Sequence, residues 1–293
     1  MVELAEAYVS ILPDSEKALT YACKAFEVDA ADENVRALLE KIAVDNGMYE
    51  ALVRFYGGQV DNIEELELAQ IVRHRMADIY ELELELNQEA IDVHMKIIEF
   101  SPSDSESLES LERLYKELGF FTELAEVYQH RVEQAETDSA RVALMRELSR
   151  IRSDLLGETD VAITILCDLL IIEQQDIPAL KKLAVLYEGE AADEKAQETL
   201  QRLIEASADN EPELLQANLE LARMRFDKLD RENDAFSLLD ENVRTVPTHE
   251  KTRSFLRERL ELALTEERSA LALRYAELNT IAMRAGPEAR ELV

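Results

Sequence analysis

The sequence predicts an all-α protein in which about eight helical hairpins form an α-solenoid. Only 7 Gly and 6 Pro interrupt 293 residues, whereas Ala, Leu and Glu, which favour helices, are abundant. Apolar residues recur at the three- and four-residue spacing of amphipathic helices. A similar pattern returns about every 36 residues, which indicates a repeat architecture.

Two slightly unequal repeats alternate along the chain. A leucine or methionine marks each first helix: Leu4, Leu39, Met76, Leu111, Leu148, Leu183, Leu221 and Leu256. The spacings between these positions alternate between 35 and 37 or 38 residues. Two repeats therefore add up to 72 residues, which is also the separation of Tyr56 in AVDNGMYEALVRFY from Tyr128 in LYKELGFFTELAEVY.

Each repeat holds two helical patterns. In the fourth repeat, apolar residues from Leu108 to Leu118 form one helix face, Gly119 stops that helix, and a second face runs from Leu124 to Val132. The two helices must fold back on each other. The predicted repeats span approximately 1-30, 31-62, 63-103, 104-137, 138-175, 176-210, 211-246 and 247-286. Because 287-293 resembles the start of a further repeat and Met1 falls inside a helical pattern, we expect a segment of a longer array.

The repeats resemble the tetratricopeptide family, whose first helix carries Leu-Gly-x-x-Tyr. The matching segments are Leu4-Ala5-x-x-Tyr8, Met76-Ala77-x-x-Tyr80 and Leu183-Ala184-x-x-Tyr187, with alanine as the small residue. Departures are the absence of Trp and the arginines at the tyrosine position of the fifth and seventh repeats. Half-a-tetratricopeptide arrays fit less well because they rely on tryptophan. The resemblance implies a right-handed superhelix with first helices on a concave wall that binds protein or peptide.

The charge excludes some functions. A formal net charge of -31 repels nucleic acid and anionic membrane surfaces. No window approaches 18 uncharged apolar residues, so we expect no membrane insertion. Cytoplasmic residence is the default expectation, and the preference for Arg over Lys hints at a bacterial source.

Motifs for catalysis, cofactors or metals are not found in the sequence. His74, His94, His130 and His249 lack the paired spacing of metal ligands, and His74, the one histidine predicted on the concave wall, is interpreted as solvated. Gly57 and Gly58 are not followed by the Lys-Ser/Thr pair or the third glycine of a phosphate-binding loop, and they are interpreted as a turn. We therefore expect a non-enzyme without cofactor or metal.

The two cysteines are 144 residues apart, which is twice 72. Cys23 and Cys167 thus occupy equivalent positions of their second helices, and the register predicts both in the core. About four hairpin layers of roughly 10 Å would separate them, so no disulfide is expected between them.

A group of cations falls on positions that face the groove, by resemblance to the family. These residues are Arg113, Lys116, Arg146, Arg150, Lys181 and Arg223, and Val185 falls on a groove position of the sixth repeat. They could bind an acidic peptide or a C-terminal carboxylate of a partner. The simpler interpretation pairs Arg113 with Glu109 and Glu117, at about 0.3 to 0.5 kcal/mol for each surface pair. The same positions in the third repeat hold His74, Asp78 and Glu81, so the wall is expected to change sign.

Three functions are compatible with these features. The leading hypothesis is a non-catalytic scaffold that binds a peptide or helix of a partner protein in its concave groove. The first alternative is a structural component of a larger assembly, formed by array stacking or self-association. The second is an accessory repeat segment of a larger enzyme or regulator.

Overall fold

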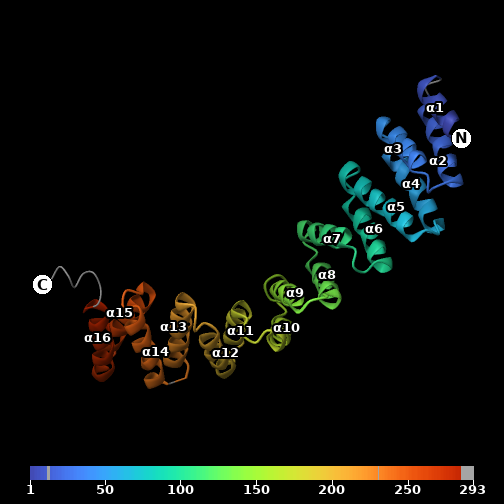
Figure 1. Cartoon of the computed structure of the whole chain (residues 1–293). Coiled ribbons are helices and arrows are strands. Elements are labelled where there is room, and N and C mark those ends of the chain that lie inside the picture. Colours follow the sequence, from blue (N-terminus) through green and yellow to red (C-terminus); the bar gives the residue numbers. More distant parts are fainter. Residues whose placement is uncertain (12–13, 230, 285–293) are drawn as a thin grey trace. The chain divides into compact units, whose positions relative to one another are not determined.

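The computed structural model describes residues 1–11, 14–229 and 231–284. Sixteen α-helices and no strands are present in these ranges, and consecutive helices pair as hairpins (Figure 1). The predicted all-α, hairpin architecture is confirmed. The predicted further repeat at 287-293, with the last two residues of the eighth predicted repeat, lies outside the described residues.

The chain divides into two compact parts, Met1–Glu136 and Thr137–Val293. The first part holds α1 (Val2–Ser10), α2 (Ser15–Val28), α3 (Glu33–Asp45), α4 (Tyr49–Gln59), α5 (Leu66–Asp78), α6 (Asn87–Phe100), α7 (Ser105–Leu118) and α8 (Phe121–Gln134). The second part holds α9 (Asp138–Arg150), α10 (Thr159–Ile172), α11 (Ile177–Gly189), α12 (Asp193–Ala206), α13 (Glu211–Asp227), α14 (Glu232–Thr245), α15 (Glu250–Thr265) and α16 (Ser269–Arg284). Three short elements follow first- or second-helix ends: η1 (Val60–Asn62), η2 (Ile79–Glu83) and η3 (Ile151–Leu155).

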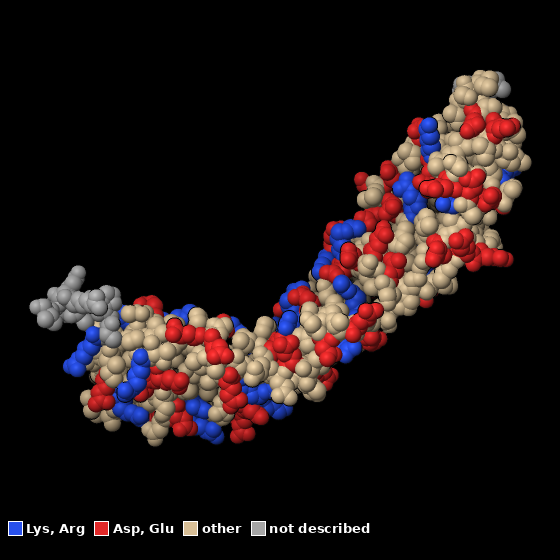
Figure 2. Space-filling model, viewed as in Figure 1, with Lys and Arg blue, Asp and Glu red and all other residues tan. Residues whose placement is uncertain are grey.

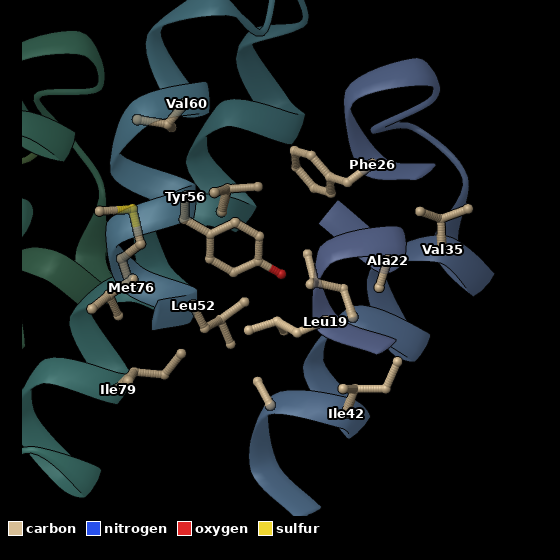
Figure 3. Packing of buried hydrophobic residues seen from close by; sticks show 14 of the residues in the cluster. Leu19, Ala22, Phe26, Val35, Ile42, Leu52, Tyr56, Val60, Met76 and Ile79 are labelled. Carbon is tan, nitrogen blue, oxygen red and sulfur yellow. The ribbon is translucent and has the colours of Figure 1, made fainter. Parts of the chain in front are cut away.

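The core follows the repeat. Seven of the eight marker residues are buried, from Leu39 to Leu256. In the first part, a cluster from α2 to α5 surrounds Tyr56, whose ring centroid lies 5.5 Å from that of Phe26 (Figure 3). Each hairpin thus buries its apolar faces against its neighbours, as expected when a single hairpin is too small to form a core.

Leu4, the remaining marker, is 46% exposed, although its neighbour Ala5 is fully buried. In later repeats, the hairpin before a first helix can cover one side of that helix. Among the described helices, α1 packs mainly on α2 and α3, which follow it. The first repeat therefore differs from the other seven in the burial of its marker residue.

The 72-residue period is present in the helix N-caps. Asp32, Asp104 and Asp176 lie 72 residues apart and cap α3, α7 and α11. Each carboxylate accepts a hydrogen bond from a backbone N–H in the first turn, which satisfies a donor that the helix leaves unpaired.

The hairpin turns have the same period. α5 and α9 both end in a π-helical turn, η2 and η3, which begin 72 residues apart at Ile79 and Ile151. The alternate hairpins have no π-helical segment, and their turns contain one residue in the left-handed region: Gly47, Gly119 and Ala191, again 72 residues apart. The two π-helical hairpins also contain one left-handed residue each, Glu85 and Gly157. Between α3 and α12, the presence or absence of a π-helical turn therefore distinguishes two hairpin types that alternate.

Arginines replace the motif tyrosine in two repeats and contact the start of the following second helix. Arg152 donates from Nη1 to Glu158 Oε2 at 2.7 Å, next to α10. Arg225 is buried and donates from Nη1 to the carbonyl oxygen of Asp234 in α14 at 3.4 Å. A long side chain with several donors thus joins the two helices where the family has an aromatic ring.

Two sequence interpretations are wrong at the level of single residues. Gly57 and Gly58 lie inside α4 and not in a turn. A Cβ atom at Gly57 would lie 3.6 Å from Met76 Cε of α5, an ordinary van der Waals distance. Cys167 is exposed and Cys23 only half-buried, so the equivalent position lies at the edge of the core.

In the described part of the chain, every helix is too short or too polar to cross a lipid bilayer.

Candidate binding face of the first helices

The first-helix face is the surface formed by the groove positions of the first helix of each hairpin. Arg113 and Lys116 lie on it in α7 of the first part. The other four predicted cations lie in α9, α11 and α13 of the second part. The first-helix face is therefore described in each part by itself.

Arg113 and Lys116 line a surface hollow of about 420 Å³ on α7, with Glu109, Glu112 and Glu117. The Arg113 guanidinium contacts Glu81 Oε1 of η2 at 2.7 Å and Glu117 Oε1 at 3.8 Å. The hydrogen bond that Arg113 donates to the Glu81 carboxylate raises the pKa of Arg113. The closer partner of Arg113 thus comes from the preceding hairpin and not from its own helix.

Glu112 in the same hollow joins α7 to α8. Its carboxylate contacts Lys116 Nζ at 2.5 Å, accepts a hydrogen bond from the Tyr128 hydroxyl at 2.7 Å and pairs with Arg131. Burial opposes ionisation of Glu112, but the bonds from Lys116 and Tyr128 outweigh it and lower the pKa of Glu112. The Lys116 ammonium is consequently engaged within the chain.

Three cations of the second part are also paired. Arg146 contacts Asp176, with Nε 2.9 Å from Oδ2. Arg150 Nε lies 3.0 Å from Glu147 Oε2, and Lys181 Nζ lies 2.8 Å from Glu213 Oε2 of α13. Cations and carboxylates also alternate over the molecular face drawn in Figure 2.

Several of these pairs join successive first helices. Glu81 with Arg113, and Lys181 with Glu213, each connect residues 32 apart. Such pairs link neighbouring hairpins and neutralise the cations that could otherwise attract a ligand. Surface ion pairs of this kind contribute little stability, on the order of 0 to 1 kcal/mol.

Arg223 differs from the other five predicted cations. Among the described residues, no carboxylate lies within ion-pair distance of its guanidinium, whose central carbon lies 5.1 Å from the ring centroid of Phe255. This distance is that of a cation–π contact, which orients the guanidinium without neutralising it. Arg223 therefore remains available to an anion.

Arg223 lines a second hollow of about 360 Å³, formed by α11, α12 and α13. We call it the α11–α13 hollow. Buried Ala184, Leu200 and Met224 contribute its apolar surface. Val185, at a predicted groove position, lies beside them and is 62% exposed.

The acids of the α11–α13 hollow are already engaged. Glu188 Oε1 lies 3.1 Å from Lys228 Nζ, and Asp227 pairs with Arg259. Glu220 accepts a hydrogen bond from Gln216 at 2.7 Å. Of the two cations that line this hollow, Arg223 alone has no acid partner among the described residues.

Sequence reasoning placed Val185 and Arg223 on the groove side, but it missed Leu200, Met224 and Phe255. Leu200 and Met224 follow the core pattern, so no local signal shows that they also border a hollow. Phe255 lies 32 residues beyond Arg223 and is found only when the stacking register of α13 and α15 is known.

The interpretation of His74 as a solvated histidine is wrong. Its side chain is 18% exposed, and Nε2 lies 3.2 Å from Asp104 Oδ2. The His74 ring also lies 6.3 Å from that of buried His94, whose Nδ1 is 3.2 Å from the Ser107 hydroxyl. Within the described residues, no group of three or more His, Cys, Asp or Glu side chains is arranged to hold a metal ion.

The paired helices, the buried markers and Ala184 at the small motif position decide the fold class. The fold is tetratricopeptide-like. No known family profile and no curated protein sequence matches the chain. Solved structures of tetratricopeptide repeat (TPR) proteins are similar to it at low identity.

The C-terminal part of a TPR protein from Cytophaga hutchinsonii is 13% identical, with a TM-score of 0.45 over 86% of this chain and 98% of the other. YrrB, described as a TPR protein with an unusual peptide-binding site, is 14% identical, with a TM-score of 0.41 over 62% of this chain and 89% of its own. A thermophilic TPR protein of Thermus thermophilus is 16% identical, with a TM-score of 0.32 over 71% and 98%.

Proposed function

We propose that the chain is a non-catalytic scaffold that binds a peptide or a single helix of a partner protein on its first-helix face. The α11–α13 hollow is the observation that supports this function most directly. There, an exposed valine adjoins buried apolar side chains and an unpaired guanidinium. Apolar pockets beside a few fixed polar groups are typical of grooves that receive extended or helical peptides.

Helical packing would make this surface rigid before a ligand arrives. Ala184 and Met224 are buried on α11 and α13, so the neighbouring Val185 and Arg223 project from fixed helices. A pre-organised surface loses less conformational entropy on binding. The scaffold function therefore requires no closure of the fold.

The test is a selection from random peptides of about 15 residues, displayed on phage and panned against the chain. Affinities of the selected peptides are then measured by fluorescence anisotropy. Substitution Val185→Asp is expected to weaken binding at least about tenfold, because a carboxylate would replace the exposed apolar contact. The matched control is Ile171→Asp, at an exposed β-branched residue near the end of α10, a second helix.

Binding to the Ile171→Asp variant should stay within about twofold of the unmodified chain. Failure to enrich any peptide, or equal binding to the Val185→Asp variant, would contradict the proposed function. Circular dichroism of both variants verifies that the helices are retained.

A second candidate function is self-association, favoured by the apolar surface of α1. Met1, Leu4 and Ile11 are 56%, 46% and 74% exposed. They follow a helical stripe, and the position of Leu4 is buried in the seven later repeats. Light scattering over a range of concentrations tests this candidate: self-association that Leu4→Glu abolishes supports it, and a monomer at all concentrations contradicts it. A role as accessory segment of a larger enzyme stays a prediction.

A further inference from the structure

This inference rests on the proposed function and concerns the chemistry of the partner. We infer that Arg223 selects a partner segment that carries a single side-chain carboxylate next to an apolar side chain. A run of several acids, which the group of six cations had suggested from the sequence, would be disfavoured. The argument follows from the charges and contacts of the α11–α13 hollow.

The first step is the state of the Arg223 guanidinium. It lies against the ring of Phe255, which is 2% exposed and therefore fixed in the core. A planar guanidinium that stacks on a ring through its face keeps the N–H groups at its edge for other acceptors. Those donors match the two oxygens of one carboxylate, and such bidentate pairs are among the stronger hydrogen-bonded contacts.

The second step is the balance of charge around it. The hollow is lined by three carboxylates, Glu188, Glu220 and Asp227, and by two cations, Arg223 and Lys228, so its formal charge is -1. The whole chain has a formal net charge of -31. One carboxylate can pair with Arg223, but further acids would meet like charge nearby and at long range.

The third step is the apolar surface beside Arg223. Val185 is exposed, and Ala184, Leu200 and Met224 border the same hollow. A partner that places an apolar side chain on this surface removes Val185 from water, which favours binding in proportion to the apolar area buried. The recognised element is therefore a carboxylate and an apolar side chain that project from one face of a helix or strand.

The experiment pans the same random-peptide library in parallel on the unmodified chain and on the variants Arg223→Gln and Arg244→Gln. Arg244 is the matched control because it is an exposed arginine on α14, a second helix, paired with Asp240 at 2.6 Å. Selected peptides are expected to contain one Asp or Glu near an apolar residue and to lack acidic runs. Their affinity should fall about tenfold with Arg223→Gln and stay within about twofold with Arg244→Gln.

Double substitutions test the contact itself. Replacing the acid of the peptide by its amide should weaken binding about as much as Arg223→Gln, and combining both changes should add little. Arg223→Lys keeps the charge but loses the planar fork, so an intermediate loss is expected. Amidation of the peptide C-terminus distinguishes a terminal carboxylate from a side-chain carboxylate as the group that Arg223 binds. Peptides whose binding depends on the free C-terminus and not on the side-chain acid would overturn the inference.

The outcomes separate this inference from the proposed function. Peptides that depend on Val185 but bind equally well to the Arg223→Gln variant would leave the scaffold function standing and overturn the role of Arg223. Enrichment of highly acidic peptides would overturn the charge argument. If no peptide depends on Val185, the proposed function itself fails.

Discussion

Asp176 binds Arg146 of α9 and caps α11 through the same carboxylate. Its Oδ1 accepts a hydrogen bond from the backbone N–H of Ala179 at 2.8 Å, while Oδ2 contacts Arg146 Nε at 2.9 Å. His74 and Asp104 form the equivalent contact 72 residues earlier, at 3.2 Å. The helix cap is thus also the charge contact between a first helix and the next hairpin.

We expect Asp176→Ala to destabilise the second part by about 2 to 3 kcal/mol. The variant loses an N-cap, which contributes about 1 kcal/mol, and leaves Arg146 without its nearly buried partner. Hydrogen exchange of the α11 amides measures the local effect. The control Asp240→Ala removes a half-buried acid that pairs with exposed Arg244 within α14, and it should cost less than about 0.5 kcal/mol; an equal cost at both sites would contradict the dual role of Asp176.

The residues of the left-handed turns predict opposite effects at equivalent positions. Gly119 has φ of 74° and Ala191, 72 residues later, has φ of 54°. Because a Cβ atom disfavours this region, Gly119→Ala should destabilise by about 1 kcal/mol and Ala191→Gly should stabilise by about 0.5 to 1 kcal/mol. Thermal unfolding of both variants measures the signs. Two shifts of the same sign would contradict the equivalence of the turns.

Acid should weaken the packing between α6 and α7 through His94. Burial, together with nearby His74, lowers the pKa of His94 to about 4, against about 6.5 in an unfolded chain. The fold thus favours the neutral imidazole. The stability that this preference contributes is fully present above about pH 6.5 and is lost as the pH falls towards 4. At pH 5 the loss relative to pH 7.5 amounts to about 2 kcal/mol.

The substitution His94→Gln isolates this contribution. The variant should be less stable at pH 7.5, because the contact with Ser107 changes, but its stability should fall less steeply between pH 7.5 and 5. Urea unfolding at several pH values measures the two slopes. Parallel slopes would show that other groups account for the acid sensitivity. One such group is Asp104: burial opposes its ionisation, but its hydrogen bonds with Ser107 and nearby His74 lower its pKa.

The two thiols should differ in reactivity although they occupy equivalent positions. Burial raises the pKa of Cys23 to about 11, so only about a thousandth of this thiol is ionised at pH 8. Cys167 is exposed, near the Tyr187 hydroxyl at 3.6 Å. We expect iodoacetamide to modify Cys167 at least about tenfold faster, as followed by mass spectrometry of the peptides. Equal rates would contradict the burial of Cys23.

The repeat and the hairpins could be predicted from the sequence because they depend on a spacing of apolar residues that recurs in every repeat. The burial of the marker Leu111, for example, could be predicted because the apolar pattern around it lies within a single helix. The partner of Arg113 could not be predicted in this way. Spacing along one helix suggests Glu109 and Glu117, whereas the closer partner, Glu81, belongs to another hairpin. Such a contact depends on the stacking register.

Register alone also fails at the edge of the core. Cys23 and Cys167 share a position in the repeat, yet one is half-buried and the other exposed. Gly57 and Gly58 carry a weak local preference for helix, yet both lie within α4. Similarly, the free guanidinium of Arg223 follows from where the surrounding acids find other partners.

Between α3 and α12, hairpins with and without a π-helical turn alternate, and this has a consequence for how such a protein can change in length. Excision of one hairpin would bring two junctions of the same type together and separate an aspartate such as Asp176 from its cation in the preceding helix. Loss or duplication of two consecutive hairpins would restore every junction. The smallest interchangeable module of this chain is therefore a hairpin pair, and recombination or engineering should succeed in steps of two.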